Sequence, residues 1–499
     1  MMKAHYENYV CGGEICRAVG QSIVECRLPA LEVAKVLTAE GSAALLSATC
    51  ENGEIRYSGR LLLTVVYEDT EGKICRAERG AEFFHKAENG AIAPAHFAVG
   101  DIDVESVSVR REGAGVFVSA LTAAQFTVYG RKETQYLLGG EGLALKRETA
   151  PFIKVAPASV TFEEEDEFET EYAEGVLLHT ENAFVTSAIC TMGQIEVGGE
   201  IGIQLCILKR DGSLCSYERV VPFKTQVPCD EAMPLTAAEA KVSVSAAQIT
   251  AQTDEEKGTA KIVCHLTLFA DCKAYIKEEL SVCVDAYSTT HKLVLKEEKA
   301  VGRYLSNERI YTERIVGAPV LEMPAEEWKL RAVIAPRGVV TAVNGENGAL
   351  TVEGVVEGKL IAESENGGFG CYPFSLPFLV PLSLTGDGFE TAVSVCGVGV
   401  RRKAGGETEA EATLKICVRC YEQTTARFIA AVEEGEELEE NDSAFSIYLP
   451  VKGDDLWTTA KKLSQLPEDF EKCNEGVSFP LKGEERLLIY RQKREISQK

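Results

Sequence analysis

The chain is poor in the residues that carry most enzyme chemistry. Its 499 residues include only 6 His, 2 Trp and 5 Met. The histidines are scattered outside any paired zinc-binding pattern, and the sequence contains no Walker loop, GxSxG elbow or GxGxxG turn. Its only CxxC, at Cys417 and Cys420, lies in a strand-like run that points the two thiols to opposite faces. We therefore expect no metal, no cofactor and no enzymatic activity.

Long hydrophobic runs are missing as well. No stretch of about 18 apolar residues occurs, so the sequence predicts no transmembrane segment. The first residues lack the apolar region of a secretory signal. The 17 Cys form an odd set scattered along the chain, which favours reduced, mostly buried thiols over a disulfide framework. These features predict a cytoplasmic protein.

Positive charge is in short supply. Lys and Arg number 52 against 77 Asp and Glu, which gives a formal charge of −25. Nucleic acid and anionic membrane both require a clustered cationic surface. We therefore expect neither as a partner.

The chain repeats itself. Ten residues are identical when 43–78 is laid on 183–218, and a larger shift adds a third copy. A period of about 140 to 155 residues suits tandem domains rather than a solenoid. Three sets of positions recur in every copy: Gly59, Gly199 and Gly354; Gly72, Gly212 and Gly367; and Phe83, Phe223 and Phe378.

Each copy has the pattern of a β domain. In the second copy, apolar residues alternate at period two over 201–207, as in a half-buried strand, and a glycine-ended turn follows. We predict a mainly-β chain of three tandem antiparallel sandwiches or open barrels. The predicted domains are 1–150, 151–295 and 296–432, with a short connecting helix at 296–309.

The C-terminal part has a different pattern. Residues 433–442 form an acidic run that predicts a solvated linker. Within 443–499, a strand at 448–451 precedes an N-cap at Asp455 and an apolar helical stripe that includes Trp457. Pro467 opens a second helix, Asn474 ends it, and 487–490 closes the unit as a strand. The tail is therefore predicted to be a small βααβ domain.

These residues carry two resemblances. The run 28–33, Gly59 and the aliphatic strand ending at Tyr67 look like a SPOCS domain, as does 284–288 at the end of the second copy. The tail is similar to a LysM domain, since 453–457 stands on that family's Gly-Asp-Thr-Leu-Trp. Together, three SPOCS-like units and a LysM-like tail resemble the SipL family of clostridial spore coat morphogenesis proteins.

The resemblance implies a function and a site. It implies a non-enzymatic protein of the mother-cell cytosol, recruited to the forespore surface, whose LysM-like tail contacts the ATPase of the coat basement layer. The alternative is a peptidoglycan-binding protein, because the two loops of sugar-binding LysM domains, here 453–456 and 475–483, form a groove for N-acetylglucosamine. Asp455 replaces the usual hydroxyl residue of that groove. The candidate partner-binding residues are Gly453, Asp454, Asp455, Leu456, Val477, Phe479 and Leu481.

Overall fold

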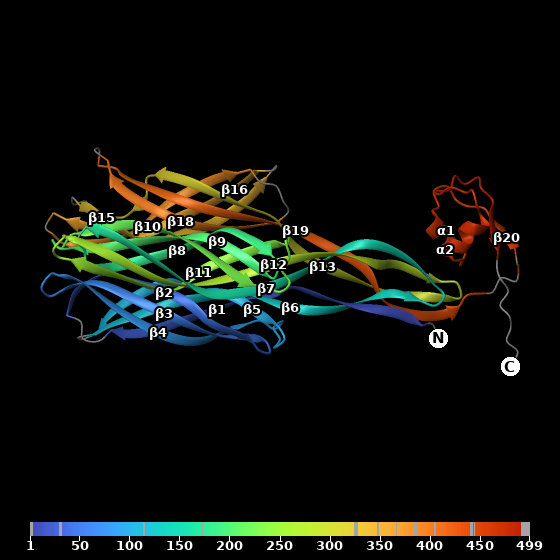
Figure 1. Cartoon of the computed structure of the whole chain (residues 1–499), viewed down its shortest axis with the longest axis horizontal. Helices are drawn as coiled ribbons and strands as arrows, with labels where there is room; N and C mark the ends of the chain where they lie inside the picture. Colours follow the sequence, from blue (N-terminus) through green and yellow to red (C-terminus); the bar gives the residue numbers. More distant parts are fainter. Residues whose placement is uncertain are drawn as a thin grey trace.

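The computed structural model describes residues 3–28, 32–112, 115–171, 173–323, 328–346, 349–365, 367–383, 388–403, 406–439, 443 and 445–490. Strands dominate these residues, and two short helices lie near the C-terminal end. The predicted mainly-β fold is confirmed. Three units of antiparallel sheets lie side by side, and a small βααβ module lies apart from them (Figure 1).

The first β unit shows how each copy is built. Its strands form two antiparallel sheets, ordered β1-β6-β5 and β2-β3-β4. Both sheets contribute side chains to one apolar core, in which Ile55, Leu61 and Leu63 are fully buried. The strands are β1 (Ala4–Leu28), β2 (Val33–Cys50), β3 (Glu54–Asp69), β4 (Ile74–Glu88), β5 (Phe97–Glu112) and β6 (Gly115–Gly140).

The second β unit has the same order, with sheets β11-β12-β7 and β10-β9-β8. In both units the first strand pairs with the last one, so each unit closes on itself. Its strands are β7 (Leu143–Glu171), β8 (Ala173–Thr191), β9 (Gln194–Lys209), β10 (Leu214–Pro228), β11 (Ala237–Asp254) and β12 (Thr259–Ser288).

The third β unit adds one short strand to this plan. Its sheets are β13-β19-β18 and β14-β17-β16-β15. Its strands are β13 (His291–Gly317), β14 (Val320–Leu321), β15 (Trp328–Glu346), β16 (Ala349–Ser364), β17 (Phe369–Leu382), β18 (Gly388–Arg402) and β19 (Thr408–Glu437).

The repeated glycines take the same place in all three units. Gly59, Gly199 and Gly354 are each the sixth residue of a central strand, inside the strand rather than at its start. Each pairs with the repeated phenylalanine of the neighbouring strand, and a Cβ at any of them runs into that ring. Glycine is therefore required by close packing. The predicted hairpin turns are also confirmed, because φ is positive at Gly72, Gly212 and Gly367.

The first and last strands of each unit continue past their sheets. Beyond Tyr129, Tyr275 and Tyr421, the described residues of the third strand no longer pair, and the first and last strands continue as a pair. Their inward side chains form shared cores around Phe152 and Phe428. The six extensions run together toward the βααβ module (Figure 1). We call them the stalk: residues 4–13, 130–140, 143–154, 276–288, 291–304 and 422–437.

The stalk corrects three predictions. The expected domain ends at 150, 295 and 432 fall inside β7, β13 and β19. The helix predicted at 296–309 is wrong, because these residues lie in β13 and pair with β19. The acidic residues 433–437 belong to β19 rather than to a linker, and 440–442 lie outside the described residues. At 296–309 and 433–437, strand pairing overrides a charged local sequence.

The tail module has the predicted βααβ order, although its first strand lies at 445–448 rather than at 448–451. Its elements are β20 (Phe445–Tyr448), α1 (Leu456–Lys462), α2 (Pro467–Cys473) and β21 (Leu487–Tyr490). Asp455 caps α1, Pro467 begins α2 and Asn474 ends it, all as the sequence indicates. The Asn474 side chain also donates to the Leu488 carbonyl and accepts from its amide, which ties α2 to β21.

Candidate functional site

The two predicted loops of the tail module lie against each other. The Gly453 amide donates to the Leu481 carbonyl (2.8 Å), and the Leu481 amide donates to the Asp454 carbonyl (2.9 Å). Gly453 has a φ of +95°, which favours glycine at this turn. The space between 453–456 and 475–483 is therefore closed by backbone hydrogen bonds at this point.

Leu481 is not a surface residue. It is 2% exposed and packs in one core with Phe470 and Leu487. Its prediction as a partner contact is wrong. The alternation of Val477, Phe479 and Leu481 reflects inward packing, because a domain this small must use its loop residues to complete its core.

The other apolar candidates also serve that core. Leu456, Val477 and Phe479 are partly buried and pack against it. Phe479 was predicted to meet a partner, but its ring packs against this core. The Phe479 ring therefore caps the module's own core.

The two candidate carboxylates are engaged within the module. Asp455 caps α1 by accepting from the Thr458 amide (2.6 Å), and hydrogen bonds from Thr458 lower the pKa of Asp455. Asp454 pairs with Lys462 Nζ at 3.1 Å and accepts from the Val451 amide. Both side chains therefore stabilise the start of α1.

The exposed apolar surface of the module lies elsewhere, on its two-stranded sheet. Phe445 pairs with Tyr490, and Ile447 with Leu488, in the β20–β21 register. The Phe445 and Tyr490 rings are 5.2 Å apart. We call the four exposed apolar side chains of these two pairs the sheet face: Phe445 (62% exposed), Ile447 (67%), Leu488 (40%) and Tyr490 (46%).

Trp457 faces the second β unit. Its indole Nε1 donates to Asp285 Oδ2 (2.8 Å), and its ring meets Tyr287 edge-on with 5.0 Å between centroids. Lys461, one helical turn further on, pairs with Asp285 at 2.6 Å. The Tyr287 hydroxyl donates to the Gln465 carbonyl (2.6 Å). Trp457 was predicted in the apolar stripe of its helix, and it also makes this long-range contact, which no local pattern signals.

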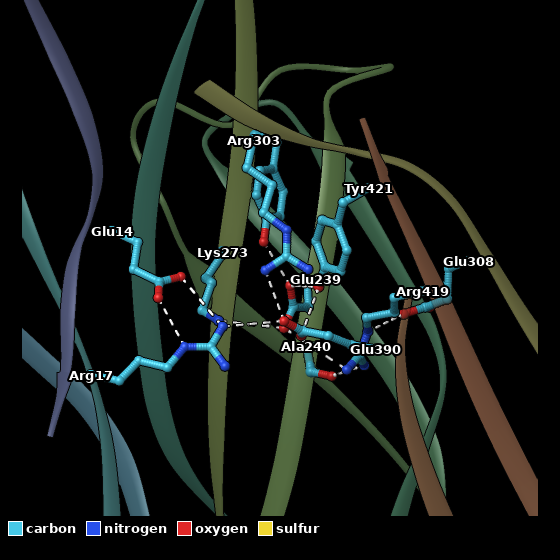
Figure 2. A network of polar contacts seen from close by, with 11 residues as sticks. Glu14, Arg17, Glu239, Ala240, Lys273, Arg303, Glu308, Glu390, Arg419 and Tyr421 are labelled. Atoms are coloured by element: carbon cyan, nitrogen blue, oxygen red, sulfur yellow. Dashed lines mark hydrogen bonds and ion pairs between the residues drawn. The ribbon is translucent and has the colours of Figure 1, made fainter. Parts of the chain in front are cut away.

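A second cluster of polar residues joins the β units around Glu239 of β11 (Figure 2). The Glu239 carboxylate accepts from the hydroxyls of Tyr275 (2.7 Å) and Tyr421 (2.8 Å). Lys273 lies 3.3 Å from it, and Arg419 of the third unit lies at 3.8 Å. Every one of these side chains is at least three-quarters buried, so the cluster is part of the interior.

Neighbouring groups keep the Glu239 carboxylate ionised. Burial alone raises the pKa of this carboxyl, because the ionised form loses its hydration. The cations Lys273 and Arg419, together with the two tyrosine hydroxyls, overcome that effect and lower the pKa to about 2. A buried carboxylate of this kind is stable only while its partners are present.

The first unit reaches the same cluster through Arg17. This residue pairs with Glu14 at 2.8 Å and with Glu390 of the third unit at 3.3 Å. Glu390 also pairs with Arg303 at 2.8 Å, and the Arg303 guanidinium lies over the Tyr421 ring (Figure 2). The network therefore connects all three units.

The network has a signal in the sequence that lies outside the repeat 43–83. Three tyrosines recur at equal intervals along the chain: Tyr129, Tyr275 and Tyr421. Each pairs with the first residue of the neighbouring strand, which is β5, β11 or β18. Two residues before each tyrosine, three equivalent pairs face each other across the strands: Thr127 with Val99, Lys273 with Glu239, and Arg419 with Glu390.

A chamber of about 2500 Å³ lies between the three units, beside this network. One edge strand of each sheet contributes to its wall: β2 and β5, β8 and β11, and β15 and β18. Asp271 is half-buried in the wall. Burial raises the pKa of Asp271 to about 7, against the opposing charge of Lys273. The chamber wall therefore contains an acidic group that titrates near neutral pH.

The cysteines follow the expected burial. All 17 are free thiols, and Cys50 and Cys190 are buried at matching places in the first two units, while Cys75 and Cys215 are half-buried at theirs. Over the described residues, no three His, Cys, Asp or Glu side chains are grouped to hold a metal ion. In the same part of the chain no helix has the length and apolarity to span a membrane.

Comparisons of the chain with protein-family models, curated proteins and solved structures give no match.

Proposed function

We propose that this chain is a non-enzymatic structural and interaction protein of spore coat or spore envelope morphogenesis. Its tail module binds a protein partner, the ATPase of the coat basement layer, at the forespore surface. The chain acts from the mother-cell cytosol. This proposal follows the resemblance of the three β units to SPOCS domains and of the tail to a LysM domain.

The observation that carries the proposal is the sheet face of the tail module. Four apolar side chains, all at least 40% exposed, lie on one face of the two-stranded sheet. Contiguous exposed apolar surface of this kind is typical of protein-binding sites, and aromatic anchors such as Phe445 and Tyr490 supply much of the energy in such contacts. We therefore propose the β20–β21 sheet, rather than the two loops, as the partner-binding surface.

The loops favour the protein partner over a sugar. Asp454 is paired with Lys462, Asp455 accepts from the Thr458 amide, and backbone hydrogen bonds join the two loops. These groups are not available to a sugar without loss of contacts that stabilise α1. Binding of peptidoglycan remains an outcome that the experiment distinguishes.

The test is a pull-down from sporulating cells with the full chain as bait. Ile447→Asp places a charge on the sheet face at an exposed site, so the module stays folded while partner capture is lost. Leu379→Asp is the matched control, because Leu379 is 63% exposed on the third unit. Binding of chitin oligomers is measured in parallel. Sugar binding that Asp454→Ala abolishes, with no ATPase recovered, contradicts the proposal.

A further inference from the structure

We propose that the end of the second β unit is a dedicated receptor for the tail module, with Asp285 as its selective anchor. This docking sets the direction in which the sheet face is presented. Only the use of the sheet face as a partner-binding surface rests on the proposed function. The receptor itself is argued from the contacts of the stalk.

The three units have equivalent stalk ends, so a physical reason is needed for the tail module to dock on the second unit. Each last strand carries an extra residue at the same place, Leu138, Val284 or Ala430, where its pairing shifts by one. The residue before each bulge is buried in one shared cluster, which fixes the equivalence: Leu137, Cys283 and Ile429.

The residues after the bulge differ. Asp285 of the second unit is equivalent to Gly139 of the first and Ala431 of the third, and neither of these carries an acceptor side chain. Tyr287 is equivalent by the same count to Glu141 and Glu433. Only the second unit therefore offers both a carboxylate for Trp457 and Lys461 and an aromatic ring for the indole.

The contact has the character of a specific interface. Tyr287 and Ala144 of the second unit are buried in the same apolar cluster as the module's own core. The Asp285 carboxylate receives the Lys461 ammonium, and Lys146 contributes, after the hydrogen bonds from Thr458, to the lowered pKa of Asp455. The ion pair and the edge-on contact of Trp457 with Tyr287 together favour a single docked orientation.

The docked orientation exposes the sheet face. The residues that meet the second unit, Trp457, Lys461 and Gln465, lie on α1 and just after it. In Figure 1, α1 lies on the side of the module nearer the β units and β20 lies on the far side. The receptor therefore holds the module by α1 and the turn after it, and leaves β20 on the far side, at the end of the molecule.

The test uses tryptophan fluorescence, because the chain has only two tryptophans. Trp328→Phe in the full chain leaves Trp457 as the sole reporter, and the Trp328 Nε1 has no hydrogen-bond partner among the described residues. In this background, Asp285→Ala is expected to shift Trp457 emission to the red. Its acrylamide quenching constant is expected to rise about twofold as the indole leaves the interface.

Matched variants separate docking from folding. Glu279→Ala removes an exposed carboxylate from the same strand and is expected to leave quenching unchanged. Lys461→Ala, on the module side, is expected to raise quenching as Asp285→Ala does, and Asp285→Asn to have an intermediate effect. Quenching that is unchanged in both Asp285→Ala and Lys461→Ala overturns the receptor. If these variants lose docking and the protein captures no ATPase under any condition, the receptor is supported. Only the proposed function is then contradicted.

Discussion

Two carboxylates join separate parts of this chain, and they do so in different surroundings. The Glu239 side chain is 10% exposed and collects donors from two β units, whereas the Asp285 side chain is 28% exposed and collects two donors from α1. A buried charge is costly to leave unpaired, while a partly exposed pair contributes little net stability. We infer that Glu239 makes a permanent joint between β units and that Asp285 makes a reversible joint to the tail.

The largest expected effect comes from removing the buried partner. Glu239→Ala leaves Lys273 and Arg419 buried without their common counter-charge, and its cost is about 3–5 kcal/mol in the free energy of unfolding. Urea denaturation followed by circular dichroism measures it. Arg17→Ala is the matched control, because the Arg17 side chain is 60% exposed in the same network and its loss costs less than about 1 kcal/mol. Equal costs for the two variants contradict the distinction between the joints.

A core change within one unit is expected to have an intermediate effect. Gly199→Ala drives a methyl group into Phe223 and the Phe184 carbonyl, and overpacking of this kind costs about 1–3 kcal/mol. Gly193→Ala, at the open turn before the same strand, meets no atom within 4 Å and strains only the backbone. Thermal unfolding compares them. A larger loss for Gly193→Ala is inconsistent with the packing described for β9.

The last prediction concerns pH, and its effect is spread over several pH units. Because the pKa of Asp271 is raised to about 7, the folded state binds a proton that the unfolded state releases from about pH 4 upward. Stability should therefore fall as pH rises through this window, by at most about 1.4 kcal/mol per pH unit, and level off above pH 7. Asp271→Asn should remove this slope. Unfolding free energies at pH 5, 6, 7 and 8 test it, and an unchanged slope contradicts the assignment.

The sequence predicted the parts of the fold that depend on local geometry. Gly59, Gly199 and Gly354 were found by repetition, since a ring packed over a strand admits no side chain at that position. The N-cap at Asp455 and the proline at 467 were readable because capping is satisfied within a few residues. Where one turn decides the structure, the residues of that turn are sufficient.

The parts of the fold that depend on distant partners could not be predicted from the sequence. Residues 296–309 carry charges that suit a helix, and only pairing with β19 makes them a strand. Leu481 has the pattern of a contact residue, because nothing in its loop shows that it completes a core around Phe470. Asp285 lies 172 residues from Trp457, so the receptor could not be found before the two were placed together.

The measurement that tests the account most directly is the affinity of the full chain for the coat basement-layer ATPase. We predict that Ile447→Asp weakens binding by about 30-fold or more, since a central apolar contact contributes at least about 2 kcal/mol. Leu379→Asp should leave the dissociation constant unchanged. An ATPase that binds all three proteins equally well, or binds none of them, contradicts the assignment of the β20–β21 sheet face as the partner surface.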